Sequence, residues 1–468
     1  MRNTKFALAA MTLAVLAGCG GSADPKPGDQ TIKNKYSAQV SFGDSLSDVG
    51  SYAVGTVAAL KGGKFTINGD NTAVASTLTG KNWTELVAAQ LGLPAPCAAV
   101  TGLDGDASKG FSVPQKANAG CYGYAQGGSR VTNPVGPGNK LTGSALGALT
   151  IPVVTQVANH LKAVGGKFKG DEMVFVMAGG NDVLFQLAAL SAGATAAGTA
   201  AGGPVYLQNL VPQLAAGATN PQTAAQAIAF AAQTEAARAG SDQASITRVA
   251  IGAAAVQPGN SAVASPTVYG PMVEKATVAA TAAGNKAGLD YATAKGPELV
   301  AALGAAGTEL ANLVKTQILA NGANFVTVNN LPDVATTPSG RGQSAATQAL
   351  INAMVSAFNN ALTAGLSAES KVVIVDVFAV SHDQATNPGP YGLTNVTEPA
   401  CDLTPAKNAL GTSLVCNGGN LKAGDVSHYS FADEVHPTPF NNLLLARFVS
   451  RSLAVSYTHL TLPTKRIV

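Results

Sequence analysis

The sequence predicts an α/β fold, a three-layer α/β/α sandwich in which a central parallel sheet lies between two layers of helices. Short β-branched or aromatic runs alternate with longer helix-like segments after about residue 37, as expected for a sheet with helices on both faces. Each apolar run also leads into a polar turn. An Ala-rich stretch at residues 187–320 interrupts the alternation, and it predicts a helical insertion.

Four strands are expected from runs with high β-propensity. They are AQVSF (38–42), MVFVMAG (173–179), NFVTVNN (324–330) and KVVIVDVFAV (371–380). Helices are expected between them, at NWTELVAAQLG from Asn82, LTIPVVTQVANHLKAVG from Leu149 and SAATQALINAMVSAFNNALTAGL from Ser344. Within the insertion, residues 223–240 and 296–322 are also expected to be helical.

The N-terminus has the features of a bacterial export signal. Two basic residues precede an apolar run, Phe6 to Leu16, that is too short to span a bilayer. The sequence Leu-Ala-Gly-Cys at 16–19 resembles a lipobox, which predicts a lipoprotein signal peptide at 1–18, a lipid anchor on Cys19 and a tether at 19–36. We therefore expect a lipid-anchored protein of the cell envelope, with the outer membrane favoured over the inner membrane. Secretion after an ordinary signal peptide is the alternative.

The folded domain is expected to span residues 37–455. Residues 456–468 do not continue the amphipathic pattern before them, and we interpret them as a non-native tail. Charged residues make up only 12% of the chain, and no basic patch occurs, which argues against a nucleic-acid partner. We expect a monomer.

Four cysteines remain besides Cys19, namely Cys97, Cys121, Cys401 and Cys416. An even number in an exported chain suggests two disulfides, and three connectivities are open. The sequence distances favour Cys97–Cys121 and Cys401–Cys416. A zinc site would need CxxC spacing or a neighbouring histidine, which the sequence lacks, so no metal is expected.

The segment VSFGDSLSDVG, residues 40–50, ends a predicted strand in a turn. The plain interpretation is a buried strand leaving its sheet. The alternative is that the turn presents Ser45 at the carboxyl end of a parallel strand, where open α/β sheets bind ligands. A serine there becomes a nucleophile only if a base and an oxyanion site exist elsewhere in the chain.

Three further motifs supply those residue types. YAQGGSRVT (124–132) places two glycines in a loop, VMAGGND (176–182) places Asn181 just after a predicted strand, and ADEVHPT (432–438) places Asp433 three residues before His436. Each motif alone is a weak signal. Their order along the chain is specific, and no GxSxG elbow occurs, which argues against an ordinary α/β-hydrolase.

Together the four motifs resemble the marker blocks of the GDSL, or SGNH, hydrolase family over roughly residues 38–455. NWTELVAAQLGLP and VNNLPDVATTP also resemble its lipase-like branch of secreted bacterial esterases. The resemblance implies a flavodoxin-like sheet, Ser45 as nucleophile, His436 as general base and Asp433 as the acid that orients it. It also implies an oxyanion hole made by the Ser45 and Gly128 N–H groups and the Asn181 amide, with Gly127 as the alternative to Gly128.

Two positions depart from the family pattern. Gly123 stands where an Asn is usual, and Ser129 stands where an Ala is usual.

The expected function is hydrolysis of carboxylic acyl esters, with a small-molecule or lipid ester as substrate. The reaction is expected to pass through an acyl-serine intermediate and to need no cofactor. The alternatives are a carbohydrate O-acetyl esterase and a non-catalytic surface-binding lipoprotein that retains the fold.

Overall fold

The computed structural model describes the backbone of residues 35–69 and 78–459. The predicted signal peptide, Cys19 and nearly all of the predicted tether lie outside these residues, as does the end of the predicted tail from residue 460. The last helix, α12 (Pro439–His459), continues past the expected domain boundary at residue 455.

A four-stranded parallel sheet forms the centre of the fold. Its strands are β1 (Gln39–Gly43), β4 (Met173–Met177), β5 (Phe325–Asn329) and β6 (Val372–Val375), in the order β1-β4-β5-β6. A short segment extends the sheet beyond β1, because Ser41 and Gly123 form a parallel bridge. When the Gly123 segment is counted as a strand and the five strands are numbered afresh along the chain, their order across the sheet is 2-1-3-4-5. This is one of the common orders of doubly wound sheets. The fold is therefore mixed α/β around a parallel sheet, compatible with an α/β sandwich.

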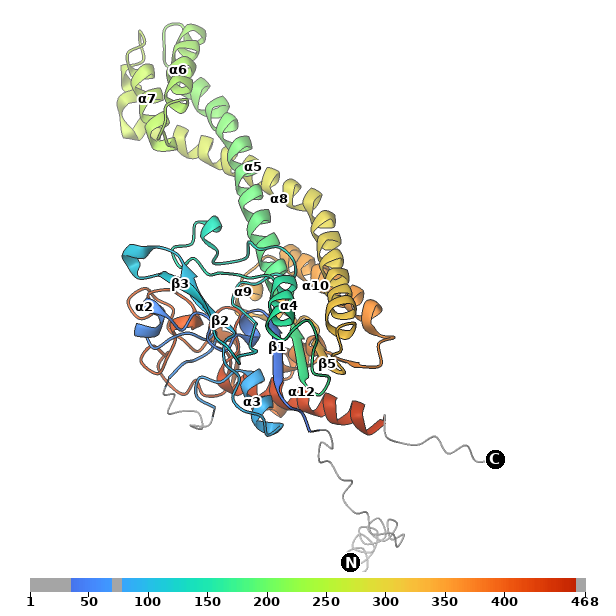
Figure 1. Cartoon of the computed structure of the whole chain (residues 1–468). Helices are drawn as coiled ribbons and strands as arrows, with labels where there is room; N and C mark the ends of the chain where they lie inside the picture. Colours follow the sequence, from blue (N-terminus) through green and yellow to red (C-terminus); the bar gives the residue numbers. More distant parts are fainter. Residues whose placement is uncertain (1–34, 70–77, 460–468) are drawn as a thin grey trace, which may run out of the picture.

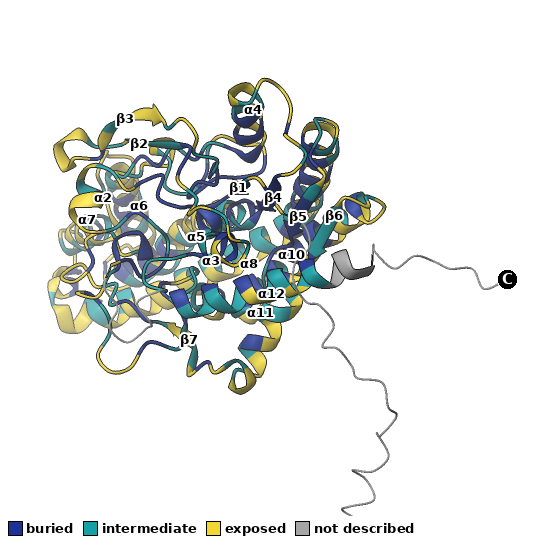
Figure 2. Cartoon of the chain, turned by 60° about the horizontal axis from the view of Figure 1, so that its bottom comes forward, coloured by how far each residue is buried: buried dark blue, intermediate teal, exposed yellow. Residues whose placement is uncertain are grey.

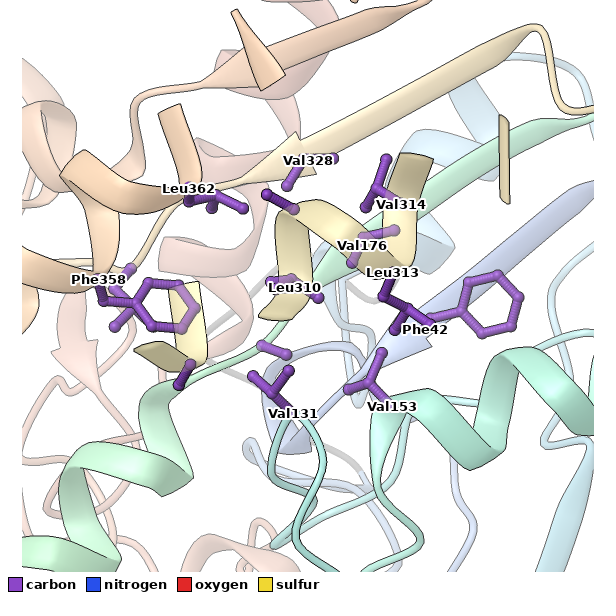
Figure 3. Close-up of a cluster of buried hydrophobic side chains, with 14 of the residues drawn as sticks. Phe42, Val131, Val153, Val176, Leu310, Leu313, Val314, Val328, Phe358 and Leu362 are labelled. Atoms are coloured by element: carbon purple, nitrogen blue, oxygen red, sulfur yellow. The ribbon is translucent and has the colours of Figure 1, made fainter. Parts of the chain in front are cut away.

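Helices cover both faces of this sheet. On one face, strand residues such as Phe42, Val176 and Val328 pack against α4 (Val153–Ala163), α10 (Ala345–Leu366) and the last turns of α8 (Pro266–Leu313) (Figure 3). On the other face, the alternate strand residues pack against α3 (Trp83–Gln90) and α12. Trp83 is fully buried there, with its ring 5.1 Å from that of Phe175. Strands β1 and β4 lie in the buried interior (Figure 2).

Each predicted strand and helix corresponds to an element of the structure, but several bounds differ. Helix α4 begins four residues after Leu149, α6 (Pro221–Ala236) ends four residues before residue 240, and α8 begins 30 residues before residue 296. The predicted strand 371–380 is wrong in its second half, because β6 ends at Val375 and helix α11 (Val377–Thr386) begins two residues later. The physical reason is a helix cap, since the Asp376 carboxylate accepts a hydrogen bond from the Ala379 N–H. Unpredicted elements are β2 (Val100–Asp104), β3 (Ser112–Ala117), β7 (Asn395–Pro399), β8 (Tyr429–Phe431), α2 (Gly55–Ala59) and α9 (Pro338–Arg341).

Residues 180–313 form a projection that we call the helical arm. It consists of α5 (Gly180–Ala215), α6 (Pro221–Ala236), α7 (Gln243–Ala255) and α8, and Figure 1 shows α5 and α8 side by side with α6 and α7 at the far end. The far end has a hydrophobic core of its own, which includes Leu210, Leu214 and Ile228. A six-residue π-helix, Val314–Leu319, follows α8 and leads back to β5.

Small residues allow the two long arm helices to approach closely. A Cβ added to Gly198 would lie 2.9 Å from the Gly284 carbonyl oxygen, and a Cβ added to Gly284 would lie 2.9 Å from the Gly198 carbonyl oxygen.

By length and composition alone, helix α5 could cross a membrane. Its most apolar 18-residue window has a mean hydropathy of 1.4, and only 11% of that window is buried. A helix this apolar and this exposed is unusual beside a folded domain.

Two disulfides are present, Cys97–Cys121 and Cys401–Cys416. These are the two pairs that the sequence distances favour. Both pairs are typical of a protein that folds in an oxidising compartment.

Candidate active site

Ser45 lies directly after β1, in the short 3₁₀ turn Ser45–Ser47. The Asp44 side chain caps this turn by accepting a hydrogen bond from the Leu46 N–H at 3.1 Å. Ser45 is 8% exposed. The turn therefore holds the hydroxyl at the carboxyl edge of the sheet, as its sequence predicts.

His436 lies against Ser45, although the two residues are 391 positions apart in the chain. Its Nε2 is 2.8 Å from the Ser45 Oγ, and its Nδ1 is 2.8 Å from Asp433 Oδ2. The structure thus brings together the three side chains that the sequence singles out. In this geometry a neutral imidazole can accept the serine proton at Nε2 while the carboxylate holds the proton on Nδ1.

Asp433 sits in a site made for a carboxylate. It is 3% exposed and accepts hydrogen bonds from the backbone N–H groups of Ser413 at 2.7 Å, Val435 at 3.0 Å and His436 at 2.8 Å. Burial alone would raise its pKa, but the positive charge that His436 can carry and these hydrogen bonds lower the pKa of Asp433 well below its ordinary value. Asp433 therefore stays ionised beside the imidazole.

The Cys401–Cys416 disulfide supports this carboxylate from two sides. The Cys401 N–H donates to the carbonyl of Ala432, the residue before Asp433. Cys416 closes the short turn that begins at Ser413, the backbone donor to Asp433. The disulfide thus joins the segment that carries the carboxylate to the segment that binds it.

Gly128 lies in a tight loop that only glycine can form. Its φ is +79°, and a Cβ there would lie 2.3 Å from the Pro137 carbonyl oxygen. The N–H of the neighbouring Gly127 is taken, because it donates to Asp48 Oδ2 at 2.9 Å. Within residues 35–69 and 78–454, no protein group accepts a hydrogen bond from the Gly128 or the Ser45 N–H. Of the two neighbouring glycines, Gly128 is therefore the one whose N–H is available to an oxyanion.

Asn181 is the second residue of α5, and it lies a few residues after the end of β4. It is 6% exposed, and its Nδ2 donates to the Ser129 carbonyl at 2.9 Å. A side-chain amide carries two N–H bonds, so this contact fixes the amide and leaves the second N–H available. The contact also ties α5 to the loop that carries Gly128.

Several buried side chains that support the site were not singled out from the sequence. Gln156 bonds both backbone groups of Gly43 at 2.8 Å, and Arg130 pairs with Asp182 at 2.8 Å. Asp48, inside the first motif, could have been noticed from its position. Gln156 and Arg130 could not, because their partners are distant in the sequence. The unusual Ser129 is also used, since its hydroxyl donates to the Ile151 carbonyl.

Asp44 is a second buried carboxyl group close to the triad. Burial raises its pKa to about 7, an effect that the hydrogen bond from the Leu46 N–H and the nearby charge of His436 partly oppose. The ordinary value for an aspartate is 3.8. Asp44 therefore titrates near neutral pH, unlike Asp433.

Three other histidines, His160, His382 and His428, do not join this cluster. His382 pairs with Asp333, its Nδ1 lying 2.7 Å from Oδ2, and His428 contacts Ser427 and the Phe440 ring. His160 is buried among aromatic rings. Among the residues that the structure describes, no three metal-binding side chains lie together as a group that could hold an ion.

No protein-family model matches the chain. A GDSL esterase/lipase APG from Arabidopsis thaliana is 28% identical over 141 residues, which cover 28% of this chain and 39% of the relative. The match therefore spans about two fifths of the relative's length. It supports a likeness to the GDSL proteins over this part of the chain.

Proposed function

We propose that this protein is a serine hydrolase that cleaves carboxylic acyl esters through an acyl-enzyme on Ser45. The observation that carries the proposal is the chain of contacts from Ser45 Oγ to His436 Nε2 and from His436 Nδ1 to Asp433. The similarity to a GDSL esterase/lipase agrees with it. The second His–Asp pair, His382 and Asp333, has no serine hydroxyl on the free ring nitrogen among the described residues.

In the first half-reaction, Ser45 Oγ attacks the ester carbonyl carbon while His436 Nε2 takes the hydroxyl proton. The resulting tetrahedral oxyanion is bound by the Ser45 N–H, the Gly128 N–H and the Asn181 amide, each worth about 3 kcal/mol in comparable sites. The ester C–O bond then breaks, His436 returns its proton to the departing alkoxide, and the acyl group remains on Ser45.

In the second half-reaction, water attacks the acyl-serine carbonyl. His436 Nε2 accepts the water proton, and the same three donors bind the second oxyanion. Collapse of this intermediate breaks the acyl–Oγ bond and returns the proton to Ser45, which releases a carboxylic acid. Throughout, Asp433 remains an anion and compensates the positive charge that forms on the imidazole.

The proposal is tested by trapping the nucleophile. We expect a fluorophosphonate to modify the full-length protein once, at Ser45, and to abolish hydrolysis of p-nitrophenyl acetate in the same proportion. Mass spectrometry of peptides locates the adduct, and Ser45→Ala provides the unlabelled control. Modification at another residue, or unchanged turnover after complete labelling, would refute the serine mechanism.

We further propose that the mature chain is held at the envelope by a lipid on Cys19. The two disulfides and the likeness to a GDSL protein support a location outside the cytoplasm, which this proposal requires. Cys19→Ala is expected to move the protein from the membrane fraction to the soluble fraction, because the acyl chains supply the membrane affinity. Fractionation of an expressing bacterial host checks this, with metabolic labelling by radioactive palmitate. A Cys19→Ala protein that still sediments with membranes would contradict the anchor.

A further inference from the structure

A groove of about 1620 Å³ runs along one side of the helical arm. On α5 its lining extends from Leu184 to Pro212, which corresponds to roughly 40 Å of helix at 1.5 Å per residue. At one end it is bounded by α9 and α10, and at the other by α6 and α7. Figure 1 shows the arm leaving the domain beside α9. The groove is longer than an extended palmitoyl chain.

The chemistry of the groove suits hydrocarbon. Between Asp182 and Glu235 the sequence contains no charged residue. Of the described residues that line the groove, Asp242 alone is charged, and it lies at the far end. The remainder are aliphatic, small, or uncharged polar side chains, such as Leu187, Ala188 and Thr195. Such a surface offers little to a charged or heavily hydroxylated ligand, and burial of methylene groups is the interaction that it can supply.

The inner end of the groove adjoins the candidate active site. Leu184, which lines the groove, lies three residues after Asn181 on the same helix. Ser339 lines the opposite wall, and its N–H donates to the carbonyl of Glu434, between Asp433 and His436, at 3.0 Å. Helix α5, which carries the oxyanion donor Asn181, is therefore also a wall of the groove, and the loop that carries His436 accepts a hydrogen bond from Ser339 in the groove lining.

We propose that the helical arm binds the acyl chain of a long-chain ester in this groove, while the ester carbonyl lies at Ser45. The inference rests on the proposed ester hydrolase function and assigns a substrate class to it. It gives the insertion at 180–313 the role of setting chain-length preference. The close packing at Gly198 and Gly284 keeps the two walls formed by α5 and α8 together along the bound chain.

Substitutions that fill the groove test this proposal. Ser191 and Thr195 are exposed, line the groove and lie one turn apart on α5. The double variant Ser191→Trp, Thr195→Trp is expected to lower kcat/KM for p-nitrophenyl palmitate by about tenfold or more, since losing the burial of one or two methylenes has that effect. Hydrolysis of p-nitrophenyl acetate should stay near the wild-type value, which also shows that the variant is folded.

The matched control places the same side chains on the same helix, one residue further along and outside the groove lining. Ala192 and Ala196 are equally exposed, are also one turn apart and lie outside the groove lining. The variant Ala192→Trp, Ala196→Trp should hydrolyse both esters at the wild-type rate. Unchanged palmitate hydrolysis in the groove variant, or an equal loss with both esters, would overturn the proposal.

A binding measurement separates this proposal from the hydrolase proposal. The fluorescent fatty acid cis-parinaric acid is titrated into full-length Ser45→Ala protein with and without the groove substitutions. We expect saturable binding that weakens at least tenfold in the groove variant, since its buried methylenes are displaced. Binding that the groove substitutions weaken, together with no ester hydrolysis by the wild-type protein, would retain the groove and refute the hydrolase. Acetate hydrolysis without groove-dependent binding would refute the groove alone.

Discussion

Asp433→Asn is expected to lower kcat by about 10⁴-fold, the effect typical of removing the carboxylate from such a triad without removing its shape. The asparagine amide would donate to His436 Nδ1, so the ring proton would move to Nε2. In the wild-type protein, Nε2 lies 2.8 Å from the Ser45 Oγ and can accept the hydroxyl proton, whereas in the variant a protonated Nε2 could not accept it. Steady-state hydrolysis of p-nitrophenyl acetate measures the effect.

The chain contains its own control for this experiment. Asp333 is a buried aspartate that contacts a histidine Nδ1 in the same manner, at 2.7 Å from His382. Asp333→Asn makes the same chemical change outside the triad and should leave kcat close to the wild-type value. If both variants lost activity equally, the loss would reflect damage to the fold, and Asp433 would have no special role.

His160→Phe is expected to remove a large acid sensitivity of folding. The His160 ring is fully buried, and neither ring nitrogen has a hydrogen-bond partner within the described residues. Aromatic rings surround it, with the Phe168 centroid at 4.7 Å and the Tyr124 centroid at 5.3 Å. Burial, with a smaller contribution from the charge of Lys169, lowers the pKa of His160 from 6.5 to about 4.

The sign of the pH effect follows from these values. Between pH 6.5 and 4 the unfolded chain protonates this histidine and the folded chain does not, so stability is lost as the pH falls through this window. The loss amounts to about 3 kcal/mol, at 1.36 kcal/mol per pKa unit. Urea unfolding followed by circular dichroism at pH 7 and pH 4 measures it in both proteins.

The informative quantity is the difference between wild type and His160→Phe at each pH. Asp44 titrates near pH 7 in the folded state, and it has the opposite effect, since its protonated form is favoured by folding. Both proteins contain Asp44, so its contribution cancels in the difference. An equal change in stability for the two proteins between pH 7 and pH 4 would show that His160 is not buried in its neutral form.

The parts of the site that the sequence predicts are those encoded in short segments. Ser45 follows an apolar strand run, and Asp433 and His436 lie three residues apart in a loop, so local patterns suffice to place them. The central strands are equally local, because their β-branched runs are bounded by polar turns. At residue 376 the same rule is wrong, since a single aspartate cap starts a helix within a run of apolar residues.

The parts that could not be predicted depend on contacts between distant segments. The segment at Gly123 joins the sheet through only one bridge to Ser41, which is too short for a periodicity to reveal. The bonds from Gln156 to Gly43 join residues 113 positions apart. The arm shows the same limit, because its helices are evident from their composition while their pairing depends on the close approach of Gly198 and Gly284.

The separation of Ser45 from His436 has a consequence for synthesis of the protein. The nucleophile is among the first residues of the domain to leave the ribosome, and its base, 391 positions later, is among the last. Chain elongation at about 5–20 residues per second therefore puts roughly 20 to 80 seconds between the two. A chain that stops between residues 376 and 432 contains all four central strands and still lacks both the acid and the base. Prematurely terminated products of this gene should thus be inert toward the cell's own esters.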